Sequence, residues 1–169
     1  MKRFLPIIIA LALIFSSCAS GRVSPYDVLR AVCDAEAGLP AGTFYSTDAN
    51  EESPEFLRPE LLAVAYGIPL DFDGIEGAAI RLSGNHHPAE LAVFLCKDAN
   101  AVEDVVLFCH QRIKALIQNS DLSAAVCGMS AEEYKEYVSG ATVISSGRYV
   151  ALIISSDPRY ARRAFLKAV

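Results

Sequence analysis

The amino-acid sequence predicts one α+β domain, in which helices pack on a four-stranded, mainly antiparallel sheet made of two β-hairpins. The chain has 169 residues, of which 53% are hydrophobic and 21% charged, enough apolar side chain for one folded core. Some segments repeat apolar residues at helical spacing and others at strand spacing. The strand-like segments occur in two pairs, and the predicted element order ααββα(α)ββα is typical of α+β proteins.

The first two helices are indicated by their boundaries. Ser24 followed by Pro25 is a typical helix start, because serine caps the first backbone amides and proline suits the first turn. This helix is expected to end at Gly38. Residues 41–55 are polar and acidic, and we expect a surface loop there. A second, short helix is predicted over residues 59–66.

Two pairs of segments have the composition of β-hairpins. Residues 75–83 and 89–97 are largely apolar and are joined by the turn sequence GNHHP. The second strand of this pair is apolar on both faces, which is typical of a central strand covered from both sides. Residues 141–145 and 149–155 form the second predicted hairpin, around a Ser-Gly-Arg turn.

Three helices complete the predicted domain. The longest begins at residues 98–100, carries a continuous apolar stripe and ends near Asn119. A short helix follows from Ser130, where the sequence SAEE has the spacing of a capping box, and it stops at Gly140. Asp157 begins the last helix.

The N-terminal segment has the pattern of an export signal. Lys2 and Arg3 precede the twelve-residue apolar run from Phe4 to Phe15. This run is too short for an ordinary membrane-spanning helix, which needs about 20 residues, but it suits a secretory signal. The sequence Phe-Ser-Ser-Cys that follows ends at Cys18 and is similar to the bacterial lipobox.

Lipidation of Cys18 is therefore predicted. Small residues before the cysteine give the signal peptidase access, and the thiol would carry a diacylglyceryl group, whose two acyl chains are enough for stable anchoring. The predicted organisation is a lipoprotein signal peptide at 1–17, a lipidated cysteine and short tether at 18–24, and a single α+β domain at 25–169. The alternatives are an uncleaved anchor, simple secretion or an ordinary cytosolic helix.

The charge of the chain limits its partners. The formal net charge is −5, and we recognise no Lys/Arg cluster in the folded part. Nucleic-acid binding requires a basic face, so no nucleic-acid partner is expected. The expected contacts are with the membrane, through the lipid on Cys18, and with another envelope protein or a surface polymer.

Four cysteines remain beyond the predicted anchor: Cys33, Cys96, Cys109 and Cys127. They lie mostly in apolar stretches, where a free cysteine behaves as a small hydrophobic residue, so we predict buried or half-buried thiols. An exported domain could instead pair some of them in a disulfide. A catalytic thiol is the least favoured alternative, because nothing basic adjoins Cys127 to lower its pKa.

Few residues have the pattern of a functional site. His86 and His87 lie together in the first hairpin turn and could contact a ligand weakly, but adjacent histidines point in different directions and no third metal ligand flanks them. Arg148 and Tyr149, in the second hairpin, could contact a partner. No serine-hydrolase, phosphate-loop or dinucleotide motif is present in the sequence, so no catalytic residue, metal or cofactor is predicted.

Three stretches resemble a known family. They are AYGIP at Ala65–Pro69, SGNHHPAELAVFLCKDANAVEDV at Ser83–Val105 and VISSGRYVALIISSDP at Val143–Pro158. Together with the lipobox they resemble the uncharacterised Gram-positive bacterial lipoproteins of domain-of-unknown-function family 4358. The resemblance implies a lipoprotein with this order of strands and helices, and it implies no activity or ligand.

The sequence thus favours a lipid-anchored, extracytoplasmic domain at the cell membrane with a non-catalytic binding or accessory role. One alternative is a small envelope hydrolase or metal-dependent enzyme that uses His86 and His87. Another is a purely structural envelope module.

Overall fold

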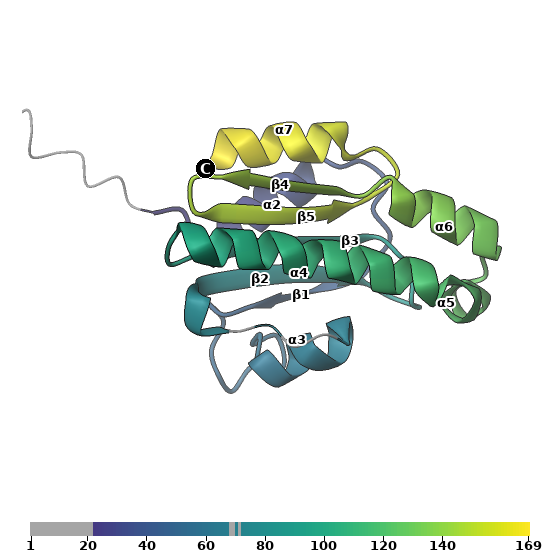
Figure 1. Ribbon diagram of the computed structural model, residues 1–169, viewed down its shortest axis with the longest axis horizontal. Helices are drawn as coiled ribbons and strands as arrows, with labels where there is room; N and C mark the ends of the chain where they lie inside the picture. The colour runs from purple at the N-terminus through teal and green to yellow at the C-terminus, as the bar shows by residue number, and fades with distance from the viewer. Residues whose placement is uncertain (1–21, 68–69, 71) are drawn as a thin grey trace, which may run out of the picture.

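The computed structural model describes residues 22–67, 70 and 72–169, which form a single sheet covered by helices on both faces (Figure 1). Every strand pairing is antiparallel, so the predicted α+β class with an antiparallel sheet is confirmed. The predicted number of four strands is wrong, because the sheet has five strands in the order β1-β2-β3-β5-β4. Cys18 and the predicted signal peptide lie outside the described residues.

The elements follow one another with short connections. The strands are β1 (Gly42–Ser46), β2 (Ile75–Ser83), β3 (Glu90–Cys96), β4 (Thr142–Ser146) and β5 (Tyr149–Ile154). The helices are α2 (Pro25–Asp34), α3 (Pro59–Tyr66), α4 (Ala99–Gln118), α5 (Ser120–Cys127), α6 (Ala131–Ser139) and α7 (Pro158–Ala168), with a 3₁₀ turn at Phe72–Gly74. No helix in the described part of the chain is both long and apolar enough to cross a membrane.

The additional strand, β1, lies inside the segment predicted as a surface loop. It is five residues long and pairs along the outer edge of β2, from Gly42 opposite Ser83 to Ser46 opposite Ala79. Gly42 is required by this close pairing, because a Cβ atom there would lie 2.6 Å from the carbonyl oxygen of Leu82. Only the residues after β1 form the expected polar loop.

The helix starts mostly follow from local sequence. Ser24 caps α2 by accepting a hydrogen bond from the backbone amide of Asp27. Ser130 and Glu133 form the predicted capping box of α6. Helix α5 was not expected. The chain re-enters a helix directly after Asn119, and α5 ends at Gly128, whose φ of 77° is a left-handed conformation that favours glycine.

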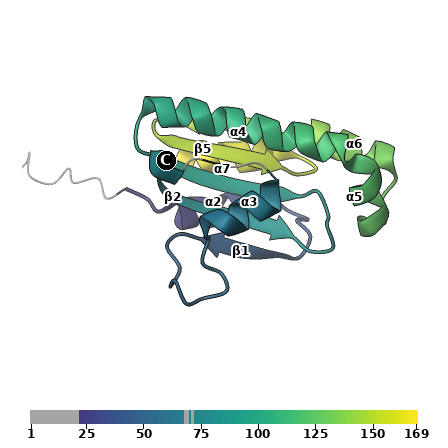
Figure 2. The same cartoon turned by 60° about the horizontal axis from the view of Figure 1, so that its bottom comes forward.

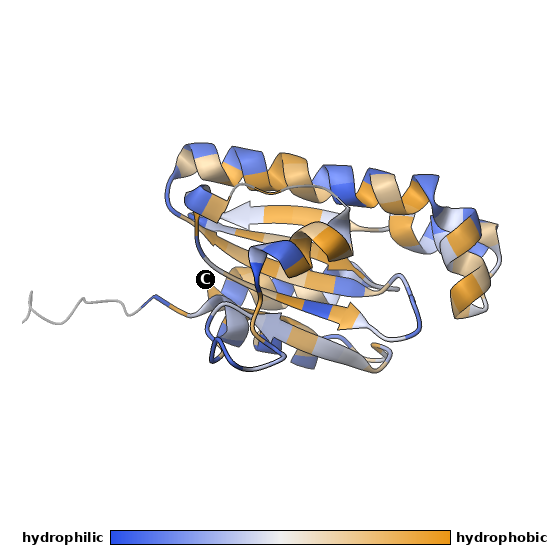
Figure 3. Cartoon of the chain, turned by 90° about the horizontal axis from the view of Figure 1, so that it is seen from below, coloured by the Kyte–Doolittle hydropathy of each residue, from blue (hydrophilic) through white to orange (hydrophobic). Residues whose placement is uncertain are grey.

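The core has two parts, one on each face of the sheet. Helices α3 to α6 cover one face, over side chains such as Ile80, Phe94 and Leu152, and α2 and α7 cover the other, over Leu91, Val93 and Ile153. All seven residues of β3 are buried, which confirms the prediction of a central strand covered on both sides. Figure 2 shows α4 along one face of the sheet, and Figure 3 shows hydrophobic residues in the strands and in the helices that cover them.

The two ends of the sheet have different roles in the fold. Residue 22, where the described chain begins, lies at the same end as the C-terminus, and helices α5 and α6 lie at the opposite end (Figure 1). At the first end the Arg22 guanidinium is 2.8 Å from the Glu76 carboxylate, and the Tyr149 hydroxyl donates a 2.6 Å hydrogen bond to the carbonyl of Val23. The start of the domain is therefore fastened to that end.

Candidate ligand-binding groove

A groove of about 710 Å³ lies at the α5–α6 end of the sheet. This volume lies within the range of ligand-binding sites, about 300–1,000 Å³. The turn between β2 and β3 forms one wall, and α3, α5, α6 and the end of α4 contribute the others. Its polar lining residues include Thr43, Asn85, His86, His87, Glu90, Arg112, Ser123 and Tyr134.

The β2–β3 turn has an unusual backbone. The amide of His87 donates to the carbonyl of Gly84, and both central residues are left-handed, Asn85 at φ 54° and His86 at φ 55°. This is the pattern of a type I′ hairpin turn, which favours Asn-Gly. Asparagine adopts this conformation readily but histidine less so, and such positions concentrate at functional sites. The left-handed backbone of His86 therefore indicates that this wall of the groove has a functional role.

The two histidines predicted as weak ligand contacts both line the groove, in different environments. His86 is exposed. His87 is half-buried, its ring lies edge-on to Tyr137, and its Nδ1 accepts a 3.1 Å hydrogen bond from the amide of Ala89. Burial lowers the pKa of His87. The neutral ring, with its proton on Nε2, is thus the form that this hydrogen bond requires.

A buried ion pair lies at the floor of the groove. Glu90 Oε2 accepts hydrogen bonds from Arg112 Nη2 at 2.8 Å and from Arg112 Nε at 3.2 Å. The two side chains are only 4% and 14% exposed. Arg112 also lies over the ring of Tyr66, with 4.7 Å from its central carbon to the ring centre. Desolvation opposes the charge of Arg112, but the adjacent Glu90 carboxylate outweighs it and raises the pKa of the guanidinium.

Two polar atoms beside this pair have no hydrogen-bond partner among the described residues: Glu90 Oε1 and the hydroxyl of Tyr66, both buried. Burial, next the charge of Glu90 and then a hydrogen bond with Glu90 raise the pKa of Tyr66 well above its ordinary value. The Tyr66 hydroxyl therefore faces the Glu90 carboxylate, in a geometry outside the usual hydrogen-bond limits. An unpartnered buried polar atom is unfavourable and concentrates at functional positions. The floor of the groove therefore holds a cluster of three polar side chains, Glu90, Arg112 and Tyr66, in contact with one another.

Sequence reasoning missed Glu90, Arg112 and Tyr66, although two signals were present. Glu90 is a carboxylate at the start of an otherwise apolar strand. Arg112 is a cation on the helical stripe that includes the buried residues Cys109 and Leu116. A charge within a buried stripe requires a partner, but the partner of Arg112 is 22 residues away in sequence and only the fold identifies it.

Arg148 and Tyr149, predicted as exposed partner contacts, lie at the opposite end of the sheet from the groove. Arg148 Nη1 is 2.7 Å from Glu76 Oε1 and donates to the carbonyl of Lys97 at 3.1 Å. The Tyr149 hydroxyl donates a hydrogen bond to the carbonyl of Val23. Both side chains thus make contacts within the chain, around the segment that leads to the predicted anchor.

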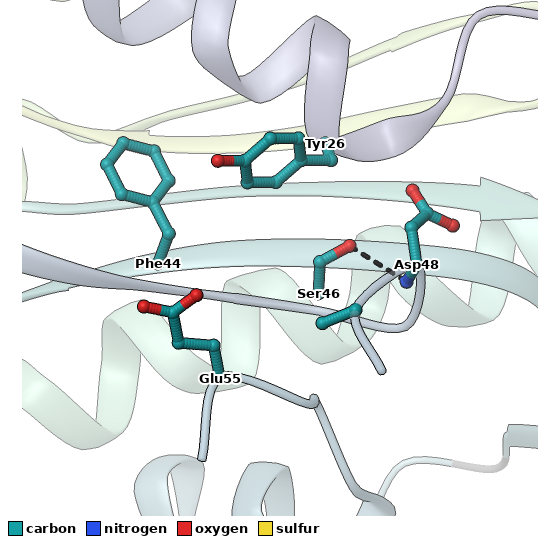
Figure 4. Close-up of a pocket in the computed structure, with 6 residues that line it drawn as sticks. Tyr26, Phe44, Ser46, Asp48 and Glu55 are labelled. Carbon is teal, nitrogen blue, oxygen red and sulfur yellow. Dashed lines mark hydrogen bonds between the residues drawn. The ribbon is translucent and has the colours of Figure 1, made fainter. Parts of the chain in front are cut away.

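A second, smaller hollow lies beside β1 (Figure 4). Its volume is about 140 Å³, and Tyr26, Phe44, Ser46, Asp48 and Glu55 line it. The Ser46 hydroxyl accepts a 3.0 Å hydrogen bond from the amide of Asp48, which fixes the start of the acidic loop. The hollow is below the usual size of a ligand site, so the larger groove is the better candidate.

The four cysteines predicted as core thiols are free, with Cys96 and Cys109 buried and Cys33 and Cys127 half-buried. Burial raises the pKa of Cys33 and of Cys96 to about 11, and it raises that of Cys109 further. A raised pKa leaves little reactive thiolate at neutral pH. Within the described ranges, no group of three His, Cys, Asp or Glu side chains is placed to hold a metal ion.

Comparison of the chain with protein-family models, curated proteins and solved structures found no match. The resemblance to the lipoprotein family therefore rests on the three quoted stretches and the lipobox alone. The function must be inferred from the groove and from the predicted anchor.

Proposed function

We propose that this chain is a lipid-anchored, extracytoplasmic binding protein of the cell membrane, and that the groove binds its ligand. The observation that carries the proposal is the buried Glu90–Arg112 pair at the floor of a 710 Å³ groove, with the buried Tyr66 hydroxyl facing Glu90. Keeping an ion pair out of water is costly, and hydrophobic residues of the same volume would often stabilise the fold as well. A binding role accounts for its presence.

The chemistry of the lining favours an uncharged ligand rich in oxygen atoms. Glu90 and Arg112 neutralise one another at the floor, so neither a cation nor an anion gains a full countercharge. The polar groups around them include the hydroxyls of Thr43, Ser123 and Tyr134 and the imidazole of His87. Tyr45, which is half-buried, adds aromatic surface. Hydroxyl-rich segments of a surface polymer have complementary groups.

The position of the groove agrees with the proposed anchor. The start of the described chain lies at the opposite end of the sheet from α5 and α6, as Figure 1 shows. Residues of these two helices line the groove. The five residues from Cys18 to Arg22, four steps along the chain, span at most about 14 Å when extended. A lipid on Cys18 would hold the first end of the domain near the bilayer, and the groove could face away from it. The Arg148 and Tyr149 contacts would fix this orientation.

The anchor is tested first. In a bacterial host, the mature full-length chain should begin at Cys18 and carry the mass of a diacylglyceryl group, and Cys18→Ser should abolish both the modification and recovery in the membrane fraction. Mass spectrometry of the N-terminal peptide and cell fractionation make the measurement. An unmodified peptide that crosses the Ser17–Cys18 bond would exclude the lipoprotein.

Ligand binding in the groove is tested with a substitution that fills it. Val64 lines the groove and is 81% exposed, so Val64→Trp should change the free energy of unfolding by no more than about 0.5 kcal/mol. It should nevertheless weaken binding of neutral envelope oligosaccharides at least tenfold, because the indole occupies the ligand volume. Isothermal titration calorimetry of the full chain makes the measurement.

Leu122→Trp is the matched control, since Leu122 is 74% exposed and does not line the groove. It should bind as the unmodified chain does. Replacing His86 and His87 by alanine should reduce oligosaccharide binding. The loss of an enzymatic activity in this variant would instead favour the alternative of an enzyme that uses these histidines. A chain that binds no oligosaccharide and shows no ligand-dependent change in melting temperature would instead be a structural module, and the proposed ligand class would be wrong.

A further inference from the structure

The outer face of α7 carries a concentration of positive charge that is unusual for this acidic chain. Four basic residues lie within nine positions of the helix, and the sequence prediction that the folded part lacks a Lys/Arg cluster is wrong there. The helix borders a hollow of about 480 Å³ beside the edge strand β4. The residues lining this hollow are Thr142, Pro158, Arg159, Arg162, Arg163 and Leu166.

Only one of the three arginines is neutralised. Both Nε and Nη2 of Arg159 bind the carboxylate of Asp157, at 2.7 and 2.6 Å. Arg162 and Arg163 are exposed and make no ion pair or hydrogen bond with any described residue. Two guanidinium groups at the hollow are therefore available to an external anion.

The packing of α7 does not require these arginines. The helix buries Ala161 and Phe165 against the sheet, and its polar face could carry any hydrophilic residue. Arg163 lies four positions before Lys167, and neither forms an ion pair with a described residue, so these like charges repel one another along the helix surface. An unfavourable arrangement that packing does not explain is consistent with a bound anion that offsets the repulsion.

We propose that the α7 hollow is a binding site for a phosphate group, independent of the ligand groove. Guanidinium groups present a planar fork of donors that matches phosphate oxygens, and Arg162 and Arg163 both line the hollow. Thr142 adds a hydroxyl-bearing side chain from β4. The start of α7 is already capped by the Asp157 carboxylate, so the site depends on the two arginines. The phosphate can belong to an anionic lipid headgroup or can be free in solution.

A fluorescent reporter can be placed in the hollow, because the chain contains no tryptophan. Leu166→Trp provides a single indole beside the two arginines. The full chain in uncharged detergent is titrated with inorganic phosphate, and the same chain is reconstituted in phosphatidylcholine vesicles with and without phosphatidylglycerol. A saturable change in emission is expected with a phosphate-bearing probe, and Arg162→Gln with Arg163→Gln should weaken it roughly 30-fold.

The matched control is Lys97→Gln with Lys114→Gln, which removes the same charge from exposed positions outside the hollow. It should retain the response, and circular dichroism checks that each variant is folded. A response to inorganic phosphate supports a site for free phosphate, and one that requires phosphatidylglycerol supports a headgroup site. The proposal is overturned by no response to either probe, by an equal response without the two arginines, or by an equal loss in the lysine control.

Discussion

Replacing Arg112 by methionine should lower the free energy of unfolding by about 3–5 kcal/mol, the usual cost of removing one partner of a buried ion pair. The Glu90 side chain, which is only 4% exposed, would lose the guanidinium that pairs with it. Arg112→Met keeps most of the apolar volume of the side chain. The decrease in the free energy of unfolding therefore measures the effect of removing the guanidinium charge. Chemical denaturation monitored by circular dichroism measures it.

Two further variants separate the ion pair from general packing. Glu90→Met combined with Arg112→Met should recover most of the stability, because no buried charge then remains without a partner. Lys114→Met, at an exposed position on the same helix, should stay within about 0.5 kcal/mol of the unmodified chain. A loss below 1 kcal/mol for Arg112→Met (about the value of an exposed pair) would show that the floor of the groove is solvated.

The contrast between strands β3 and β1 shows what the sequence could predict of the fold. Strand β3 is apolar on both faces and is followed by a capped helix, so local pattern alone located it. Strand β1 is five residues long, lies at an edge and leaves most of its side chains at least partly exposed. Nothing in a short, half-polar edge strand distinguishes it from a loop, because its pairing with β2 stabilises it.

The candidate site also contains residues that the sequence could predict and residues that only the fold brings together. His86 and His87 were found because they are adjacent and lie in a recognisable turn. Glu90 and Arg112 come together only when β3 packs under α4, and Tyr66 arrives from a third element. The partners of Arg148 and Tyr149, 72 and 126 residues away, are likewise set by the sheet. Pairings over such separations leave no spacing that a single sequence displays.

Alkaline pH should destabilise the domain, and the buried thiols should determine where this begins. The pKa of Cys33 and of Cys96 is raised to about 11 in the fold, and that of Cys109 is raised further. An unfolded thiol ionises near pH 8.5. Because the folded state holds its thiol protons more tightly, these groups contribute their full stability below about pH 8.5 and lose it as the pH rises toward 11.

A pH of about 10 lies roughly 1.5 units above the pKa of an unfolded thiol. Each thiol that stays protonated in the fold therefore lowers the free energy of unfolding by about 2 kcal/mol at that pH. Cys96 and Cys109 are fully buried and together should lower the free energy of unfolding by roughly 4 kcal/mol, while the half-buried Cys33 adds less. Denaturant titrations from about pH 8 to 10, with a reductant present, measure the slope.

Cys109→Ala identifies the source of this slope. The substitution leaves a small cavity and lowers stability at every pH, but it should also remove close to half of the decline between about pH 8 and 10. The cavity lowers the free energy of unfolding by the same amount at each pH. The slope of stability against pH therefore reports the thiol alone. Tyr66, whose pKa burial and the charge of Glu90 also raise, begins to contribute only above its ordinary value near 10, so Tyr66→Phe should leave the decline below that pH unchanged. An unaltered slope in Cys109→Ala would mean that this thiol is not desolvated, and that the α4 side of the core is looser than the packing around Phe94 and Phe108 indicates.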